Sequence, residues 1–273
     1  MAGNNVAMTE ITSGGELTAH YNSVFEANKN QWFDFETIIQ AVYEALLRPD
    51  DVAIDGGAHM GLHSVPMARK VGPGGKVFAF EPIHEIVRAF RQRIETECPE
   101  LKPIIELHEL AISDYSGVAE FLVVEDPGYS GLRERLYPRE MQKDRRKVLV
   151  DTLDHLCGGA SPVRFIKLDL EGGEFDALRG AKGILSRERP AVVFEYDRFN
   201  TPRFYHYDHG DLLRFFEDLD YQLLDVIGTP FDAPSMWDAA TLWYYFGLPR
   251  EAGLLGTVQG AIQQSIRAQA PGV

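Results

Sequence analysis

The chain has 273 residues, of which 45% are hydrophobic, and its formal net charge at pH 7 is −14. This length and apolar content can bury one large core or two small ones. The negative charge repels phosphate backbones and argues against nucleic-acid binding. The one basic run, at 133–147, also contains acidic residues and does not change this expectation.

Cysteine content and the N-terminal residues argue for a cytoplasmic setting. The two cysteines, Cys98 and Cys157, are too few for a disulfide framework or a metal cluster and fit a reducing compartment. The first ten residues have no basic segment followed by an apolar run, so we expect no signal peptide. No apolar run approaches the roughly 20 residues that span a bilayer, so no membrane partner is expected.

In chain order, the first predicted feature is a helical lead-in over residues 1–50. Apolar residues recur at helical spacing in 33–47, and Pro49 ends that pattern. From residue 51, β-branched runs alternate with amphipathic runs, which predicts a parallel sheet with helices on both faces. The predicted strands are 51–57, 76–82, 104–113, 163–172 and 190–197, and the predicted helices are 62–71, 84–95, 174–188 and 211–219.

Two regions depart from this alternation. Extended runs at 118–126 and 147–156 flank a loop rich in Gly and Arg and predict a β-rich insertion at about 118–150. The runs 221–228 and 240–248 are expected to follow each other without a helix, which predicts an antiparallel hairpin at one sheet edge. We therefore divide the chain into an N-terminal helical lead-in (1–50), a main domain (51–250) and a C-terminal helical tail (251–273).

Candidate site residues end the predicted strands, because ligands of open parallel sheets bind outside the strands' carboxyl ends. They are Asp55, Glu81, Ala111, Asp169 and Glu195. The first lies in VAIDGGAHMGLH (52–63), whose glycines are typical of a nucleotide loop. A phosphate loop would need Lys and Ser or Thr where Leu62 and His63 stand, and a dinucleotide loop would need GxGxxG, which this stretch lacks.

The pattern D-x-G-x-H-x-G in the same stretch favours a different ligand. It places Asp55 at a strand end and Gly57, His59 and Gly61 in the following loop. A carboxylate there repels pyrophosphate but suits a ligand with a cationic amino-acid end, such as S-adenosylmethionine. Glu81 could accept both hydrogens of a ribose diol, and the segment LHELAISD could border an adenine.

With these residues the chain resembles class I S-adenosylmethionine-dependent methyltransferases, and more narrowly the FkbM family. DGGAHMG, FEP, AISD, VDTLD, IKLDLEGGE and VVFE carry the resemblance, which covers residues 51 to about 196. It implies an α/β, Rossmann-like, doubly wound fold with a mostly parallel seven-stranded sheet and an antiparallel edge strand. It also implies O-methyl transfer to a hydroxyl of a sugar, glycan or polyketide-type small molecule. The implied cofactor residues are Asp55, Gly57, His59, Gly61, Glu81, Pro82, Ala111 and Asp169.

Two histidines depart from the family pattern. The family usually carries Asn where His59 stands and an aromatic residue near His63. Spaced four apart and close to Asp55, the histidines could hold a metal, but the adjacent Glu of metalloproteases is absent, and we expect no metal there. The simpler interpretation is that His59 lines the cofactor loop and His63 packs on the sheet.

Acceptor chemistry is predicted at the end of the strand 163–172. Lys167, Asp169 and Glu171 alternate there and tend to share a face. Asp169 could act as a general base, or could hold a divalent ion such as Mg²⁺ that lowers the pKa of the acceptor hydroxyl. The structural alternative is a network of Lys167, Asp169 and Glu174 that only braces the strand end.

Further candidates lie after the next strand and in the insertion. Glu171 and His206 are alternative catalytic residues, the latter in an aromatic loop that suits a carbohydrate acceptor. The loop 126–147 could fold over the acceptor as a lid. Two other functions stay open: a nucleoside-binding protein without catalysis, and an NAD-dependent sugar dehydrogenase, for which neither GxGxxG nor a good Tyr-x-x-x-Lys candidate is found. The sequence does not indicate an oligomeric state.

Overall fold

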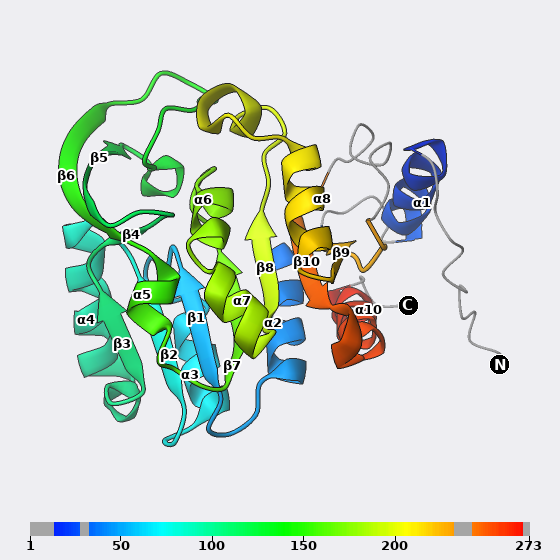
Figure 1. The fold of residues 1–273 in the computed structure, drawn as a ribbon, viewed down its shortest axis with the longest axis horizontal. Helices are drawn as coiled ribbons and strands as arrows, with labels where there is room; N and C mark the ends of the chain where they lie inside the picture. Colours follow the sequence, from blue (N-terminus) through cyan, green and yellow to red (C-terminus); the bar gives the residue numbers. More distant parts are fainter. Residues whose placement is uncertain (1–13, 28–32, 232–241, 270–273) are drawn as a thin grey trace.

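The computed structural model describes residues 14–27, 33–231 and 242–269. Seven strands form the main sheet in the order β3-β2-β1-β7-β8-β10-β9 (Figure 1). Strand β10 runs antiparallel to both of its neighbours and the other pairs are parallel, so the predicted fold class is confirmed. The strands are β1 (Val52–Gly56), β2 (Lys76–Phe80), β3 (Ile105–His108), β7 (Val163–Leu168), β8 (Ala191–Glu195), β9 (Tyr221–Asp225) and β10 (Tyr244–Pro249).

The direction in which the sheet grows reverses at β1. From β1 the chain moves outward to β2 and β3, and it later returns to the opposite side of β1 as β7, followed by β8. Ligands of open α/β sheets bind at such a reversal, outside the carboxyl ends of the strands. The ends of β1 and β7 are therefore where a site is expected.

Helices cover both faces of this sheet and enclose two hydrophobic cores (Figure 1). One core lies under α2 (Phe35–Leu46), α3 (Ser64–Val71), α4 (His84–Glu97) and α10 (Leu255–Gln269). The other lies under α5 (Leu153–Cys157), α6 (Glu174–Arg179), α7 (Lys182–Glu188) and α8 (His209–Asp218). The predicted lead-in and C-terminal helices are α2 and α10, and Gln269 ties them by accepting from the Asp34 backbone N–H at 2.7 Å.

The predicted insertion forms a second, three-stranded sheet in the order β4-β6-β5. Its strands are β4 (Ala111–Ile112), β5 (Gly117–Val124) and β6 (Lys143–Asp151). After β5, the chain forms a 3₁₀ turn, η2 (Pro127–Tyr129), and bridges back to β5 between Leu122 and Gly131 before β6 begins.

Three predicted elements differ from the structure. The single strand over 104–113 is wrong, because the chain leaves the main sheet after β3 and joins the second sheet as β4. The extended run 147–156 ends at Asp151, since the Thr152 side chain caps the following helix, α5, at the His155 N–H (3.2 Å). The helix over 174–188 divides into α6 and α7. Helix α1 (Gly14–Ala27) lies within the predicted helical lead-in.

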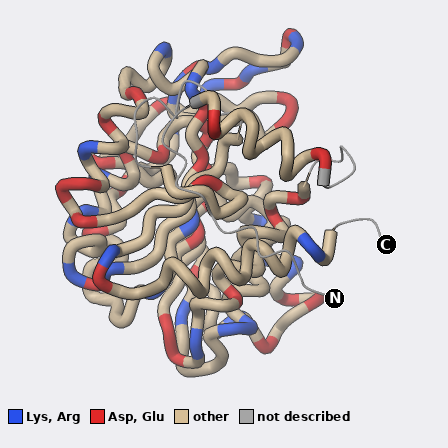
Figure 2. Tube along the Cα trace, turned by 90° about the vertical axis from the view of Figure 1, so that its right-hand side faces the viewer, with Lys and Arg blue, Asp and Glu red and all other residues tan. Residues whose placement is uncertain are grey.

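Charges of both signs are interspersed along the trace (Figure 2). On the insertion, basic side chains pair with acids, as Arg139 does with Glu125 (3.0 Å) and Lys143 with Glu134 (2.9 Å). No described helix is long and apolar enough to cross a membrane. The chain between β9 and β10, where no helix was predicted, includes residues 232–241, which lie outside the described residues. The division into lead-in, main domain and tail stays a prediction.

Candidate functional site

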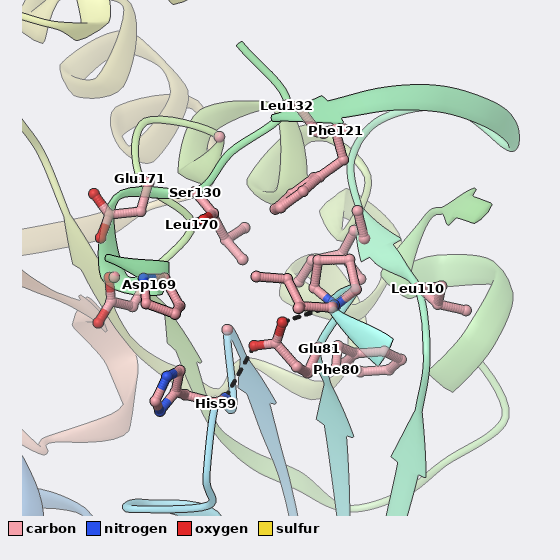
Figure 3. A pocket seen from close by; sticks show the side chains of 18 of the residues that line it. His59, Phe80, Glu81, Leu110, Phe121, Ser130, Leu132, Asp169, Leu170 and Glu171 are labelled. Atoms are coloured by element: carbon pink, nitrogen blue, oxygen red, sulfur yellow. Dashed lines mark hydrogen bonds between the residues drawn. The ribbon is translucent and has the colours of Figure 1, made fainter. Parts of the chain in front are cut away.

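A cavity of about 290 Å³ opens at the carboxyl ends of β1, β2 and β7 (Figure 3). Its wall combines residues of the main sheet with residues of the insertion. Of the predicted cofactor residues, six line it: Gly57, His59, Glu81, Pro82, Ala111 and Asp169. The cavity is therefore at the chain reversal where a ligand was expected.

The glycine loop after β1 has a shape that only glycine permits. Gly57 has φ +75°, and a Cβ there would lie 1.9 Å from the backbone oxygen of Asp169. A side chain would therefore separate the loops that follow β1 and β7. Gly61 has φ +78°, and its Cβ would meet the Phe90 ring at 2.1 Å, so Gly61 allows packing on α4 and does not line the cavity.

Glu81 points into the cavity from the end of β2 (Figure 3). One carboxylate oxygen accepts the Ile83 backbone N–H at 2.9 Å and the other accepts the His59 backbone N–H at 3.2 Å. Burial raises the pKa of Glu81 to about 7, against the two backbone bonds, which favour the charged form. Each oxygen keeps a free lone pair, so the carboxylate can receive two further hydrogens from one ligand.

The cavity wall beside Glu81 is apolar. Ile83, Leu110 and Ile112 contribute to it, together with the predicted Pro82 and Ala111. Phe121 and Leu132 come from the insertion and were not predicted. They reach the cavity because the second sheet packs against the first, and no local sequence pattern predicts that packing. A flat aromatic ring suits such a wall.

Asp55 lies beneath the cavity and does not line it. Its side chain is 1% exposed, and one carboxylate oxygen accepts the Ser64 hydroxyl at 2.5 Å. The ammonium of Lys167, itself 3% exposed, lies 3.8 Å from the other oxygen. Lys167 thus neutralises Asp55 from within the protein.

Lys167 also contacts Asp169, which lines the cavity at the end of β7. Burial favours the neutral form of Asp169, but the Lys167 charge at 3.4 Å and the Tyr244 hydroxyl, which donates at 3.0 Å, hold its pKa below the ordinary value. The Tyr244 hydroxyl is also 3.4 Å from the Glu36 carboxylate on α2. Neither Tyr244 nor Glu36 was predicted, because both reach the site through contacts distant in sequence.

Asp169 also belongs to a cluster of three carboxylates. One oxygen each from Asp169, Glu171 and Glu195 lies within 4.8 Å of the others. Glu171 is ion-paired with Arg135 of the insertion, which was not predicted. Burial and the charge of Asp169 raise the pKa of Glu195 well above its ordinary value. Oxygen donors of this kind suit a hard cation, but two of the three already face a cationic side chain.

The other candidates are not brought into the cavity. His63 is buried, with its ring nitrogens 2.5 Å from Glu36 and 3.3 Å from the Tyr43 hydroxyl, and it does not line the cavity with His59. His206 is exposed and absent from the cavity wall. The bracing network forms only in part: Lys167 contacts Asp169, whereas Glu174 accepts the backbone N–H groups of Leu170 (2.6 Å) and Gly172 (3.3 Å).

The chain was compared with family models and with known proteins. The sequence model of the methyltransferase FkbM domain matches residues 55–223. A search among curated proteins found no match.

Solved structures with similarity to the chain include methyltransferase FkbM from Methylobacillus flagellatus KT, at 16% identity and a TM-score of 0.44. The match covers 86% of this chain and 60% of that one, so the chain spans about three fifths of that protein. A SAM-dependent O-methyltransferase from Thermotoga maritima matches at 14% identity and TM-score 0.43, covering 80% and 66%. A SAM-dependent methyltransferase from Aquifex aeolicus matches at 13% and 0.40, covering 87% and 97%.

Proposed function

The chain belongs to the FkbM methyltransferase family, and on that premise we propose that it transfers the methyl group of S-adenosylmethionine to a hydroxyl oxygen of a small molecule. The acceptor class is a sugar, a glycan or a polyketide-type compound. The observation that carries the proposal is Glu81, whose two oxygens are oriented by backbone N–H groups at the cavity wall. A sulfonium-bound methyl group supplies the electrophile for such a transfer.

The residues divide between cofactor and acceptor. Glu81 would accept both ribose hydroxyl hydrogens, and the apolar wall with Pro82 and Ala111 would contact the adenine. Gly57 would let the ligand approach the backbone closely. Asp169 would accept a hydrogen bond from the acceptor hydroxyl and orient it toward the methyl carbon. Positioning of this kind can supply much of the rate.

Cofactor binding through Glu81 leads to a first prediction. Glu81→Ala removes a bidentate acceptor and is expected to weaken S-adenosylhomocysteine binding by about 1.5–3 kcal/mol, the scale of hydrogen bonds to charged groups. Wild-type affinity is also expected to fall as the pH drops through about 7, because protonation of Glu81 removes one acceptor. Isothermal calorimetry at several pH values measures both effects.

The control for this prediction is Glu106→Ala, which removes an exposed carboxylate of the neighbouring strand β3. That variant should bind like wild type. NAD should give no heat of binding. Unchanged affinity in Glu81→Ala would refute the ribose assignment, and tight NAD binding would favour a dehydrogenase.

Metal independence is a second prediction. Lys167 and Arg135 already face two of the three clustered carboxylates, so an added divalent ion would meet their positive charge. Methyl transfer is therefore expected to continue in EDTA. The assay compares turnover of chelator-treated protein with and without added Mg²⁺ or Mn²⁺. Loss of turnover that Mg²⁺ restores would instead support a metal held by Asp169 and Glu195.

A further inference from the structure

Four carboxylates line the cavity, those of Glu81, Asp126, Asp169 and Glu171. Glu81 is held by two backbone N–H groups. Asp169 faces Lys167 at 3.4 Å, and Glu171 is ion-paired with Arg135. The fourth carboxylate of the described cavity wall belongs to Asp126.

Asp126 caps η2, in the connection between strands β5 and β6 of the insertion. One of its carboxylate oxygens accepts the Gly128 backbone N–H at 3.2 Å. Within the described residues, no lysine or arginine forms an ion pair with it, whereas its neighbour Glu125 pairs with Arg139 at 3.0 Å. Asp126 is exposed and belongs to the cavity wall, so its carboxylate is accessible there and no described cation pairs with it.

The position of Asp126 is close to the glycine loop. Burial and the charge of Lys167 lower the pKa of His59, whereas the negative charges of Asp169 and Asp126 raise it. Asp126 is thus near enough to His59 to interact with it electrostatically. In the proposed arrangement, that end of the cavity would receive the amino-acid part of the cofactor, because Glu81 and the apolar wall would hold the nucleoside.

We propose that Asp126 binds the ammonium group of the cofactor's amino-acid end, a role that the sequence assigned to Asp55. The proposal rests on the proposed function. Asp55 is separated from the cavity and neutralised by Lys167, so it would act only indirectly. Asp126 lines the cavity, comes from the insertion, and has no ion-pair partner among the described residues. The insertion would thereby form part of the cofactor site itself.

Two ligands test the assignment without an acceptor. S-adenosylhomocysteine carries the amino-acid end, whereas 5′-methylthioadenosine keeps the nucleoside and thioether but lacks that end. Calorimetry measures both affinities for wild type, Asp126→Asn and Glu125→Gln. In Asp126→Asn, the asparagine oxygen can still accept the Gly128 N–H, so the turn is retained. Glu125→Gln is the control, because it removes the neighbouring carboxylate that pairs with Arg139.

In Asp126→Asn, the preference for S-adenosylhomocysteine over 5′-methylthioadenosine is expected to fall about fivefold, the scale of a solvent-accessible ion pair. Affinity for 5′-methylthioadenosine should stay unchanged, and Glu125→Gln should match wild type for both ligands. Raised salt should reduce the wild-type preference but not that of Asp126→Asn.

Two results would overturn the assignment. An unchanged preference in Asp126→Asn, or an equal loss for both ligands, would show that Asp126 does not bind the amino-acid end. Failure of the wild-type protein to bind either ligand would overturn the proposed function together with this inference. That outcome differs from failure of the Asp126 assignment alone, in which the wild-type protein binds both ligands.

Discussion

Replacing Asp169 with asparagine is expected to slow methyl transfer by about 10²–10⁴-fold, the range for a positioned acid–base group. Asparagine keeps the side-chain shape but removes the negative charge that would orient the acceptor hydroxyl and receive its proton. Affinity for S-adenosylhomocysteine should change little, because Glu81 and the apolar wall would hold the nucleoside. Turnover per folded molecule, melting temperature and ligand affinity are measured on one preparation with an acceptor that wild type methylates.

The lowered pKa of Asp169 refines its expected role. A carboxylate stabilised by Lys167 and Tyr244 is a weak proton acceptor, so it would orient the hydroxyl first and take the proton as the new carbon–oxygen bond forms. The control is Asp144→Asn, which removes an exposed carboxylate of the insertion. If Asp169→Asn melts earlier but turns over at the wild-type rate, Asp169 is only a brace, and Glu171 becomes the next candidate.

Much of the fold could be predicted because its signals are local. Strand ends marked by Asp55, Glu81 and Asp169 follow β-branched runs, and each precedes a helix or turn whose pattern is visible in the sequence. Parallel strands place their carboxyl ends at one edge of the sheet, so residues from three separate segments could be assigned to one site before the structure was known.

The parts of the site that could not be predicted depend on contacts distant in sequence. Tyr244 reaches Asp169 because β10 enters the sheet beside β8, and Glu36 reaches Tyr244 because α2 packs under the same strands. Asp126 lines the cavity because the insertion turns back at η2. Asp55 follows the predicted pattern, but its burial with Lys167 depends on the pairing of β1 and β7.

The pairing of β1 with β7 gives Lys167 a second role, in stability. Lys167→Met keeps the length of the side chain and removes its charge, leaving the buried carboxylate of Asp55 without a cation. One oxygen of Asp55 has no hydrogen-bond partner in the described structure, so the Ser64 hydroxyl on the other oxygen would be its remaining polar contact. Breaking a buried ion pair by removing one partner costs about 3–5 kcal/mol, and the free energy of unfolding at pH 7 is expected to fall by that amount.

The pH dependence and a second substitution separate this effect from lost packing. Without Lys167, burial would favour the protonated form of Asp169 in the folded state, so its penalty applies above the ordinary aspartate pKa of 3.8. The difference between wild type and Lys167→Met should therefore shrink as the pH falls from 7 toward that value, whereas lost packing would not depend on pH. Adding Asp55→Asn should recover part of the loss, and Lys102→Met, at an exposed lysine, should change stability by less than about 0.5 kcal/mol. Urea denaturation at pH 7 and near pH 4 measures all four proteins. A loss in Lys167→Met below about 1 kcal/mol would refute the stabilising role of the ion pair with Asp55, since breaking a buried pair costs more than that.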